Sequence, residues 1–117
     1  MSTYIAMIYG DERVWEAWSE EQGLANAAAH ATFNEAHGAA VIGGHELERS
    51  WRVKSVRAGA DGRPQVTDGP FLGGTTVLGG YYLIEASDLE DAVRMASALP
   101  EASAPTSGVE VRPVAAS

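Results

Sequence analysis

The alternation of strand-like and helix-like segments constrains the fold of this chain more than any other sequence feature. Short apolar runs rich in branched and aromatic residues predict strands, and apolar residues three and four apart predict amphipathic helices. The predicted strands cover residues 3–9, 41–48, 50–58, 63–67, 75–85 and 109–114. The predicted helices cover residues 19–38 and 88–99, with one or two helical turns over 11–18.

Local signals support several of these boundaries. Ser19 with Gln22, and Ser87 with Glu90, fit capping boxes that begin the two long helices. Pro100 ends the second helix, and the following residues 101–108 are expected to form a polar loop. In the first helix we expect the buried face to consist of Leu24, Ala27, Ala28, Ala31, Phe33 and Ala39.

Together these segments predict one α+β domain over residues 1–117. We set aside the short hairpin strand at 63–67 and, with one strand still in excess of the four required, interpret the order as the ferredoxin-like βαββαβ arrangement. Both helices then cover the same sheet face, and the other face needs a cover that a second subunit would supply.

The composition also favours an oligomer. Leu, Ile, Val and Phe number only 23 of the 117 residues, whereas Ala alone numbers 20, and the net charge is -8. A protein whose core is so poor in large aliphatic side chains gains stability when further surface is buried between subunits. We therefore expect a homodimer.

Composition excludes several functional classes. One Lys and seven Arg against 16 acids do not form the basic surface that nucleic acids require, and no apolar run is long enough to cross a membrane. With no Cys and no basic N-terminal region, a cytoplasmic protein is the default. The Gly-Gly pairs fit no phosphate-binding loop, and the three His fit no metal-binding motif, so no cofactor or metal is expected.

The charge is unevenly distributed. Residues 1–48 carry eight acids and one Arg (-7), residues 49–67 carry five cations and one Asp (+4), and residues 68–117 carry seven acids and two Arg (-5). A cationic segment between acidic ones usually neutralises a neighbouring surface. The alternative is a site for an anionic ligand.

Several motifs, in order along almost the whole chain, resemble the YCII-related family in its DGPF branch. The matching motifs are Asp68-Gly69-Pro70-Phe71, the run Leu78-Gly79-Gly80-Tyr81-Tyr82-Leu83-Ile84-Glu85, and Val109-Glu110-Val111-Arg112-Pro113-Val114. The resemblance implies a ferredoxin-like protomer in a dimeric α/β barrel, and it implies a sigma factor as a candidate partner. Segment 72–77 departs from the family pattern because it contains no charged residue.

The resemblance implies an acid–base pair formed by His30 and Asp68. On chemical grounds the His30 imidazole suits proton transfer near neutral pH, but it also suits a surface or backbone-bonded position. Asp68 lies at the end of a predicted strand, directly before Gly69-Pro70. Its carboxylate could act as a general base, or it could stabilise the turn by accepting backbone hydrogen bonds.

Four further residues are candidates for substrate binding. Trp51, Phe71 and one of the two adjacent tyrosines are expected to form an aromatic wall. Tyr82 could hydrogen-bond a ligand or fill the core, and Arg112 could bind a carboxylate or form a salt bridge.

These features predict a homodimer with a small-molecule cleft on each protomer. If catalytic, the protein would carry out cofactor-free proton transfer of the lyase or isomerase type, with Asp68 or His30 taking the proton and Tyr82 or Arg112 stabilising negative charge. The alternative is a non-catalytic domain that binds a ligand or a protein such as a sigma factor.

Overall fold

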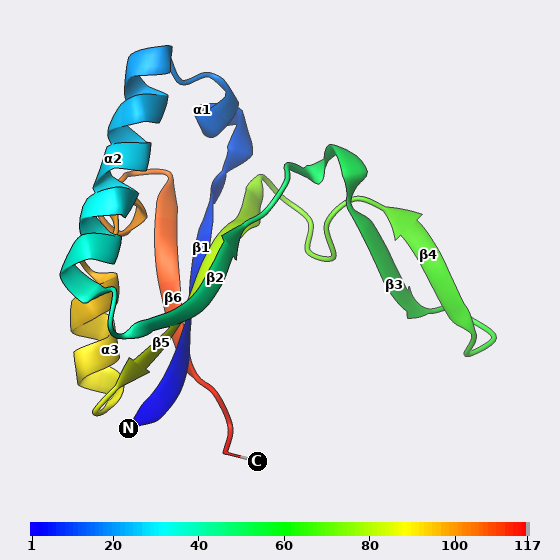
Figure 1. Cartoon of the computed structure of the whole chain (residues 1–117). Coiled ribbons are helices and arrows are strands. Elements are labelled where there is room, and N and C mark those ends of the chain that lie inside the picture. Colours follow the sequence, from blue (N-terminus) through cyan, green and yellow to red (C-terminus); the bar gives the residue numbers. More distant parts are fainter. Residues whose placement is uncertain (117) are drawn as a thin grey trace.

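The computed structural model describes residues 1–116 and shows an α+β fold built on one four-stranded antiparallel sheet (Figure 1). Its strands are β1 (Ser2–Asp11), β2 (Val41–Glu46), β5 (Thr76–Ala86) and β6 (Ser107–Pro113), in the spatial order β2-β5-β1-β6. Helices α2 (Glu20–His37) and α3 (Leu89–Ala96) lie on one face of this sheet. This strand order, with antiparallel neighbours, is the ferredoxin-like arrangement.

A hairpin stands away from this body (Figure 1). Strands β3 (Lys54–Ala58) and β4 (Pro64–Asp68) pair only with each other, so two strands lie outside the main sheet, rather than the single hairpin strand that we set aside. We call residues 54–68 the arm. The strand predicted at 50–58 is also shorter, because Ser50–Arg52 forms a 3-10 turn, η1.

The helix caps agree partly with the sequence. Ser19 accepts from the Gln22 N–H and the Gln22 side chain accepts from the Ser19 N–H, which confirms the predicted capping box of α2. Helix α3 begins one residue later than predicted, because Asp88 accepts from the Asp91 N–H and is the true cap. It also ends earlier, at Ala96, and the tighter turn η2 (Pro100–Ala102) follows.

The core lies between the sheet and the helices. Alternate residues of β1 are buried on this face, with Tyr4, Ala6 and Ile8 each below a tenth exposed. They pack with Ile84 from β5 and with the apolar side of α3. The core therefore uses one face of the sheet only.

Helix α2 contributes less to this core than its sequence predicts. Of the six residues expected to be buried, only Phe33 is, at 2 % exposed, whereas Leu24 is 64 % exposed. The remaining four, Ala27, Ala28, Ala31 and Ala39, are exposed as well. The prediction failed because small side chains give a weak periodic signal, so the inward face could not be distinguished. The partly buried residues of α2 are Gly23, Asn26, Ala29, His30 and His37.

Short helix α1 (Glu12–Glu16) places Trp15 against the end of the sheet. A Cβ added at Gly10 would lie 2.3 Å from the Trp15 ring, and one at Gly79 would lie 2.6 Å from it. The absence of side chains at Gly10 and Gly79 thus makes room for the indole, which is buried.

The sheet face opposite the helices carries apolar side chains and has no covering element within residues 1–116 (Figure 1). Ile5 pairs with Leu83 and Met7 pairs with Tyr81 across the two central strands, and these residues are only partly buried. We call these four residues the open sheet face. Within the described residues, no helix is long and apolar enough to cross a membrane.

Candidate functional site

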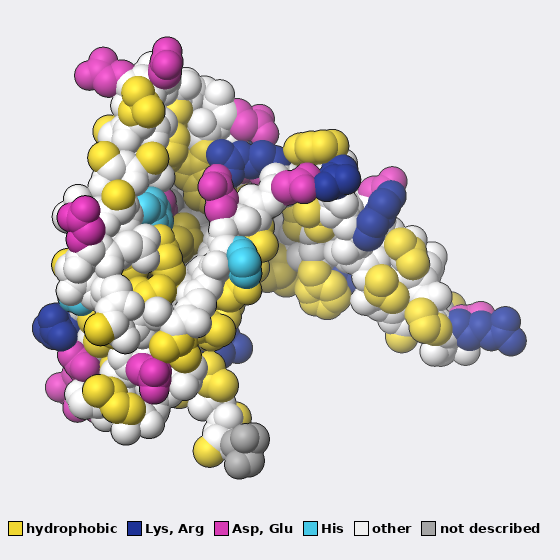
Figure 2. Space-filling model, in the orientation of Figure 1, with side chains coloured by type: hydrophobic (Ala, Val, Ile, Leu, Met, Phe, Trp, Pro, Cys, Tyr) yellow, Lys and Arg dark blue, Asp and Glu magenta, His cyan; other side chains and the backbone are white. Residues whose placement is uncertain are grey.

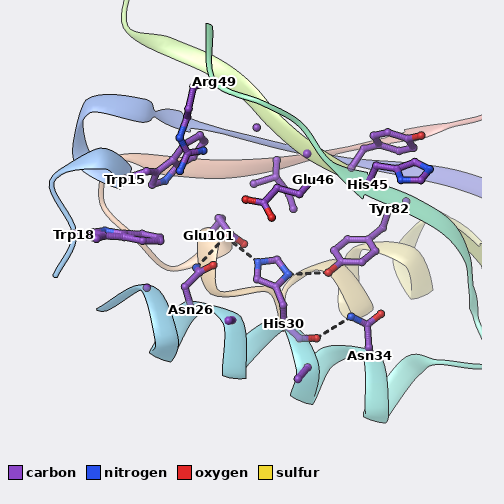
Figure 3. Close-up of a pocket in the computed structure, with 18 of the residues that line it drawn as sticks. Trp15, Trp18, Asn26, His30, Asn34, His45, Glu46, Arg49, Tyr82 and Glu101 are labelled. Carbon is purple, nitrogen blue, oxygen red and sulfur yellow. Dashed lines mark hydrogen bonds and ion pairs between the residues drawn. The ribbon is translucent and has the colours of Figure 1, made fainter. Parts of the chain in front are cut away.

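A hollow of about 760 Å³ lies between α2 and the sheet (Figures 2 and 3). Its floor comes from β2 and β5 and its wall from α2, while η2 contributes Glu101 and α1 contributes Trp15. The volume is within the range of small-molecule sites. We refer to this hollow as the cavity.

Small side chains of α2 create much of this space. Gly23, Ala27 and Ala31 line the cavity, and a Cβ added at Gly23 would meet no atom within 4 Å. The residues that do reach inward from the same helix are polar, namely Asn26, His30 and Asn34. The cavity therefore has a small-residue wall with a few directed polar groups.

A chain of hydrogen bonds crosses one end of the cavity (Figure 3). The Tyr82 hydroxyl lies 2.7 Å from Nδ1 of His30, and Nε2 of His30 lies 2.9 Å from Oε2 of Glu101. The Asn26 amide donates to the same carboxylate oxygen at 3.1 Å. We call Glu101, His30 and Tyr82 the relay.

Packing and backbone contacts hold the relay in place. Phe33 packs on the Tyr82 ring with centroids 5.0 Å apart, and the Asn34 amide donates to the His30 carbonyl at 3.0 Å. Glu101 is 6 % exposed, because η2 turns it back under α2, and Ser107 donates its hydroxyl to the Glu101 carbonyl at 3.0 Å.

The charge of Glu101 follows from its surroundings. Burial raises the pKa of Glu101, but hydrogen bonds from His30 and Asn26 outweigh this effect, and the net pKa lies below the usual value for glutamate. Glu101 is thus ionised at neutral pH. Its second oxygen, Oε1, is buried and has no hydrogen-bond partner within residues 1–116.

The ionised carboxylate determines the tautomer of a neutral His30. A carboxylate only accepts hydrogen bonds, so Nε2 must carry the proton and donate to Glu101. Nδ1 then accepts from the Tyr82 hydroxyl. When His30 is protonated, Nδ1–H donates instead to the Tyr82 oxygen, and the phenol O–H becomes free to donate into the cavity.

Tyr82 is a neutral phenol in the resting protein. Burial has the largest effect and raises the pKa of its hydroxyl, the Asn34 amide opposes this in part, and the carboxylates of Glu101 and Glu46 raise the pKa further. A free tyrosinate is therefore disfavoured. Proton transfer through Tyr82 requires His30 to receive or supply a proton in the same step.

The opposite end of the cavity is aromatic and cationic (Figure 3). Trp15 and Trp18 line it, and the guanidinium carbon of Arg49 lies 5.0 Å from the centre of the Trp15 ring. Stacking on an indole face suits a planar guanidinium. Glu46 lies between this end and the relay in the view of Figure 3.

Of the six residues singled out from the sequence, the cavity contains His30 and Tyr82. Asp68 is not brought to His30: it forms an exposed ion pair with Lys54 on the arm, while both ring nitrogens of His30 bond to Tyr82 and Glu101. The structure therefore shows no contact between the two members of the expected acid–base pair.

The other three candidates lie elsewhere. Trp51 is 74 % exposed on η1, and Arg112 forms an exposed ion pair with Glu110 on β6. Phe71 lines a second, more apolar hollow between the sheet and the segment leading to the arm, together with residues such as Val53 and Leu78. The expected aromatic wall does not form around the relay within one chain.

Several cavity residues were not anticipated from the sequence. Glu101 fell in a predicted polar loop, and only its position directly after Pro100 could have suggested a fixed conformation. Trp15, Trp18 and Arg49 come from segments with no recognisable binding motif. Their convergence depends on the placement of α1 and of the β2–η1 connection. Among residues 1–116, no three His, Asp or Glu side chains are close enough to share a metal ion.

Comparison with known proteins identifies the family of this chain. The YCII-related domain matches residues 2–116. An uncharacterised protein of Rhizobium meliloti (strain 1021) is 32 % identical over 116 residues, which cover 96 % of this chain and 91 % of the relative. The chain therefore belongs to the YCII-related family.

Proposed function

We propose that this protein binds a small molecule in the cavity and catalyses cofactor-free proton transfer on it, of the lyase or isomerase type. The observation that carries the proposal is the relay: a buried, ionised Glu101 oriented on His30, which in turn bonds to the Tyr82 hydroxyl at the cavity wall. Such a carboxylate–imidazole–hydroxyl chain is a means of moving one proton without building up isolated charge.

The step balances as follows. A substrate C–H bond breaks, its electron pair stays on the substrate as an enolate or carbanion, and its proton goes to the Tyr82 oxygen. The original hydroxyl proton of Tyr82 moves at the same time to Nδ1 of His30. Glu101 stabilises the resulting imidazolium through Nε2–H. The reverse movement returns a proton to another atom of the substrate, or to a leaving group, and restores neutral His30 and neutral Tyr82 beside the ionised Glu101.

Exchange of carbon-bound hydrogen for deuterium tests this role. Small keto acids and unsaturated lactones are incubated in D₂O and their acidic C–H signals are followed by NMR. We expect the wild type to accelerate exchange of at least one probe. Tyr82→Phe and His30→Gln should each lower the acceleration by about 100-fold, the usual contribution of a positioned acid or base.

Tyr9→Phe is the matched control, because the Tyr9 hydroxyl contacts only the Met7 sulfur within residues 1–116 and lies outside the cavity lining. It should exchange the probe as fast as the wild type does. Acceleration that survived in both relay variants would rule out the relay as the acid–base group.

The same proposal includes a homodimer that forms a dimeric α/β barrel through the open sheet face. Its support is the uncovered apolar surface of Ile5, Met7, Tyr81 and Leu83 on the two central strands. Asp68 has a place in this chemistry only if the arm of one chain reaches the cavity of the other, since its own chain leaves it at a distance from the relay.

A non-catalytic interaction domain is the alternative, and the arm favours it. Val56 is 58 % exposed and Val66 is 62 % exposed on this isolated two-stranded sheet, which gains stability from packing against a further surface. Stoichiometric binding of a sigma factor at micromolar concentration, together with no accelerated exchange for any probe, would favour this alternative.

A further inference from the structure

Arg49 differs from the other cations of the chain in its partners. Six cationic side chains form ion pairs with acids, namely Arg13, Arg52, Lys54, Arg63, Arg94 and Arg112. Arg57 donates to the Phe71 carbonyl at 2.7 Å. Within residues 1–116, Arg49 has neither an acid nor a carbonyl partner for its guanidinium, and it is the cation that lines the cavity.

The surroundings of Arg49 restrain the side chain without neutralising it. The guanidinium carbon lies over the Trp15 ring, 5.0 Å from its centre, and Trp15 is itself held between Gly10 and Gly79. A guanidinium presents five donors in a planar fork that matches a carboxylate. An ordered guanidinium with unused donors in a hollow is suited to binding an anionic group.

The rest of the cavity restricts where a negative charge is tolerated. Glu101 is ionised at the relay end, and Glu46 lies between the two ends. An anionic group close to Tyr82 would be repelled by both carboxylates, whereas a neutral hydroxyl there could exchange hydrogen bonds with Tyr82.

We propose that the ligand is a planar or aromatic monocarboxylate whose carboxylate binds Arg49 beside Trp15 and whose neutral oxygen function points to the relay. This inference rests on the proposed function, because it assumes that the cavity holds a small molecule. It adds a recognition residue, Arg49, and the charge distribution of the ligand.

Three probes of similar shape test the charge distribution. They are 4-hydroxybenzoate, its neutral amide 4-hydroxybenzamide, and terephthalate, which carries a second carboxylate in place of the hydroxyl. Binding is measured from shifts of the Trp15 and Trp18 indole N–H signals in NMR titrations. We expect 4-hydroxybenzoate to bind at least about tenfold more tightly than either of the other two.

Substitution tests the residue. Arg49→Gln should weaken 4-hydroxybenzoate binding by at least about tenfold and leave the weak binding of the amide unchanged. Arg52→Gln is the matched control, since it removes the same charge from the same segment, but its side chain pairs with Glu48 and lies outside the cavity lining. It should leave the binding of both probes unchanged.

The outcomes separate the two proposals. If the amide binds as tightly as the carboxylate, or if Arg49→Gln and Arg52→Gln have the same effect, the cavity stands as a ligand site but the role of Arg49 is overturned. If no probe shifts the Trp15 and Trp18 signals, the ligand class is overturned, and the deuterium-exchange experiment decides the proposed proton transfer separately.

Discussion

At the scale of single residues, Glu101 determines what the cavity can do. It is charged, almost fully buried and bonded to both His30 and Asn26. Its charge fixes the tautomer of His30 and thereby the direction in which the Tyr82 hydroxyl points. The Glu101 carboxylate thus determines whether the Tyr82 hydroxyl, on the other side of the His30 ring, donates or accepts its hydrogen bond to that ring.

The pH dependence of stability should reveal this carboxylate. Because the folded pKa of Glu101 lies below its unfolded value of 4.5, ionised Glu101 stabilises the fold at pH values above 4.5. This contribution is lost as the pH falls below 4.5 and through the folded pKa. Glu101→Gln should therefore lower the free energy of unfolding at neutral pH by roughly 1.5–3 kcal/mol, with a smaller difference in acid.

Urea unfolding of both proteins between neutral pH and acid measures this difference. Glu35→Gln is the control, because Glu35 is exposed on the same helix, and it should change stability by less than about 0.5 kcal/mol. A Glu101→Gln deficit that stayed constant through the acid range would contradict the assignment of an ionised Glu101.

Sequence chemistry singled out two of the three relay residues, His30 and Tyr82, as candidates, but not the third, Glu101. His30 and Tyr82 stand out because imidazole and phenol groups are rare in this chain and occur near recognisable motifs. Glu101 does not, since it is one of 16 acids and its burial depends on how η2 folds under α2. Long-range placement, rather than residue type, distinguishes it.

At the scale of elements, glycine positions show which contacts are tight and which are open. Gly79 contacts the Trp15 ring, and no room remains there for a Cβ. Gly23 lies within α2 and faces the cavity, where a Cβ meets no atom within 4 Å. The sequence does not distinguish these two glycines, but in the structure one lies at a tight contact and the other borders open space.

Alanine at these two positions should have opposite effects on stability. Gly23→Ala should raise the free energy of unfolding by about 0.5–1 kcal/mol, because alanine loses less backbone entropy in a helix. Gly79→Ala should lower it by about 1–3 kcal/mol, because Trp15 must move. Thermal unfolding of both variants measures the two shifts, and a stable Gly79→Ala protein would show that Trp15 is not held as tightly as described.

The bounds of the helices and strands could be predicted from the sequence more accurately than the side of each helix that is buried. The strands of the main sheet begin and end within two residues of their predicted bounds, because branched and aromatic residues mark them clearly. The inward face of α2 was mispredicted because alanines alternate with few larger residues to set a phase. The stretch 50–58 was read as one strand although η1 interrupts it, since the alternation of Trp51 and Val53 resembles a strand.

At the scale of the whole molecule, the chain is more extended than its length requires. The radius of gyration is 16.0 Å, against about 13 Å for a compact domain of this size. The arm carries the exposed side chains of Val56 and Val66, and the open sheet face carries apolar side chains that are only partly buried. An isolated chain of this shape leaves surface that a second copy would cover.

Light scattering at micromolar concentration should therefore give twice the chain mass of 12.3 kDa. Leu83→Glu places a charge at the centre of the open sheet face and should give the mass of one chain. Leu24→Glu is the matched control: Leu24 is 64 % exposed on α2, and its substitution should leave the dimer intact. An ordered wild-type monomer would refute the proposed dimer.

The small residues of α2 have a consequence for how such a protein can change over evolutionary time. Gly23, Ala27 and Ala31 line the cavity, but none of them belongs to the relay. A single substitution to a larger side chain at any of the three narrows the space for a ligand and leaves the proton-transfer groups in place. Ligand size and reaction chemistry are therefore encoded at separate positions, and selection can alter the first without disturbing the second.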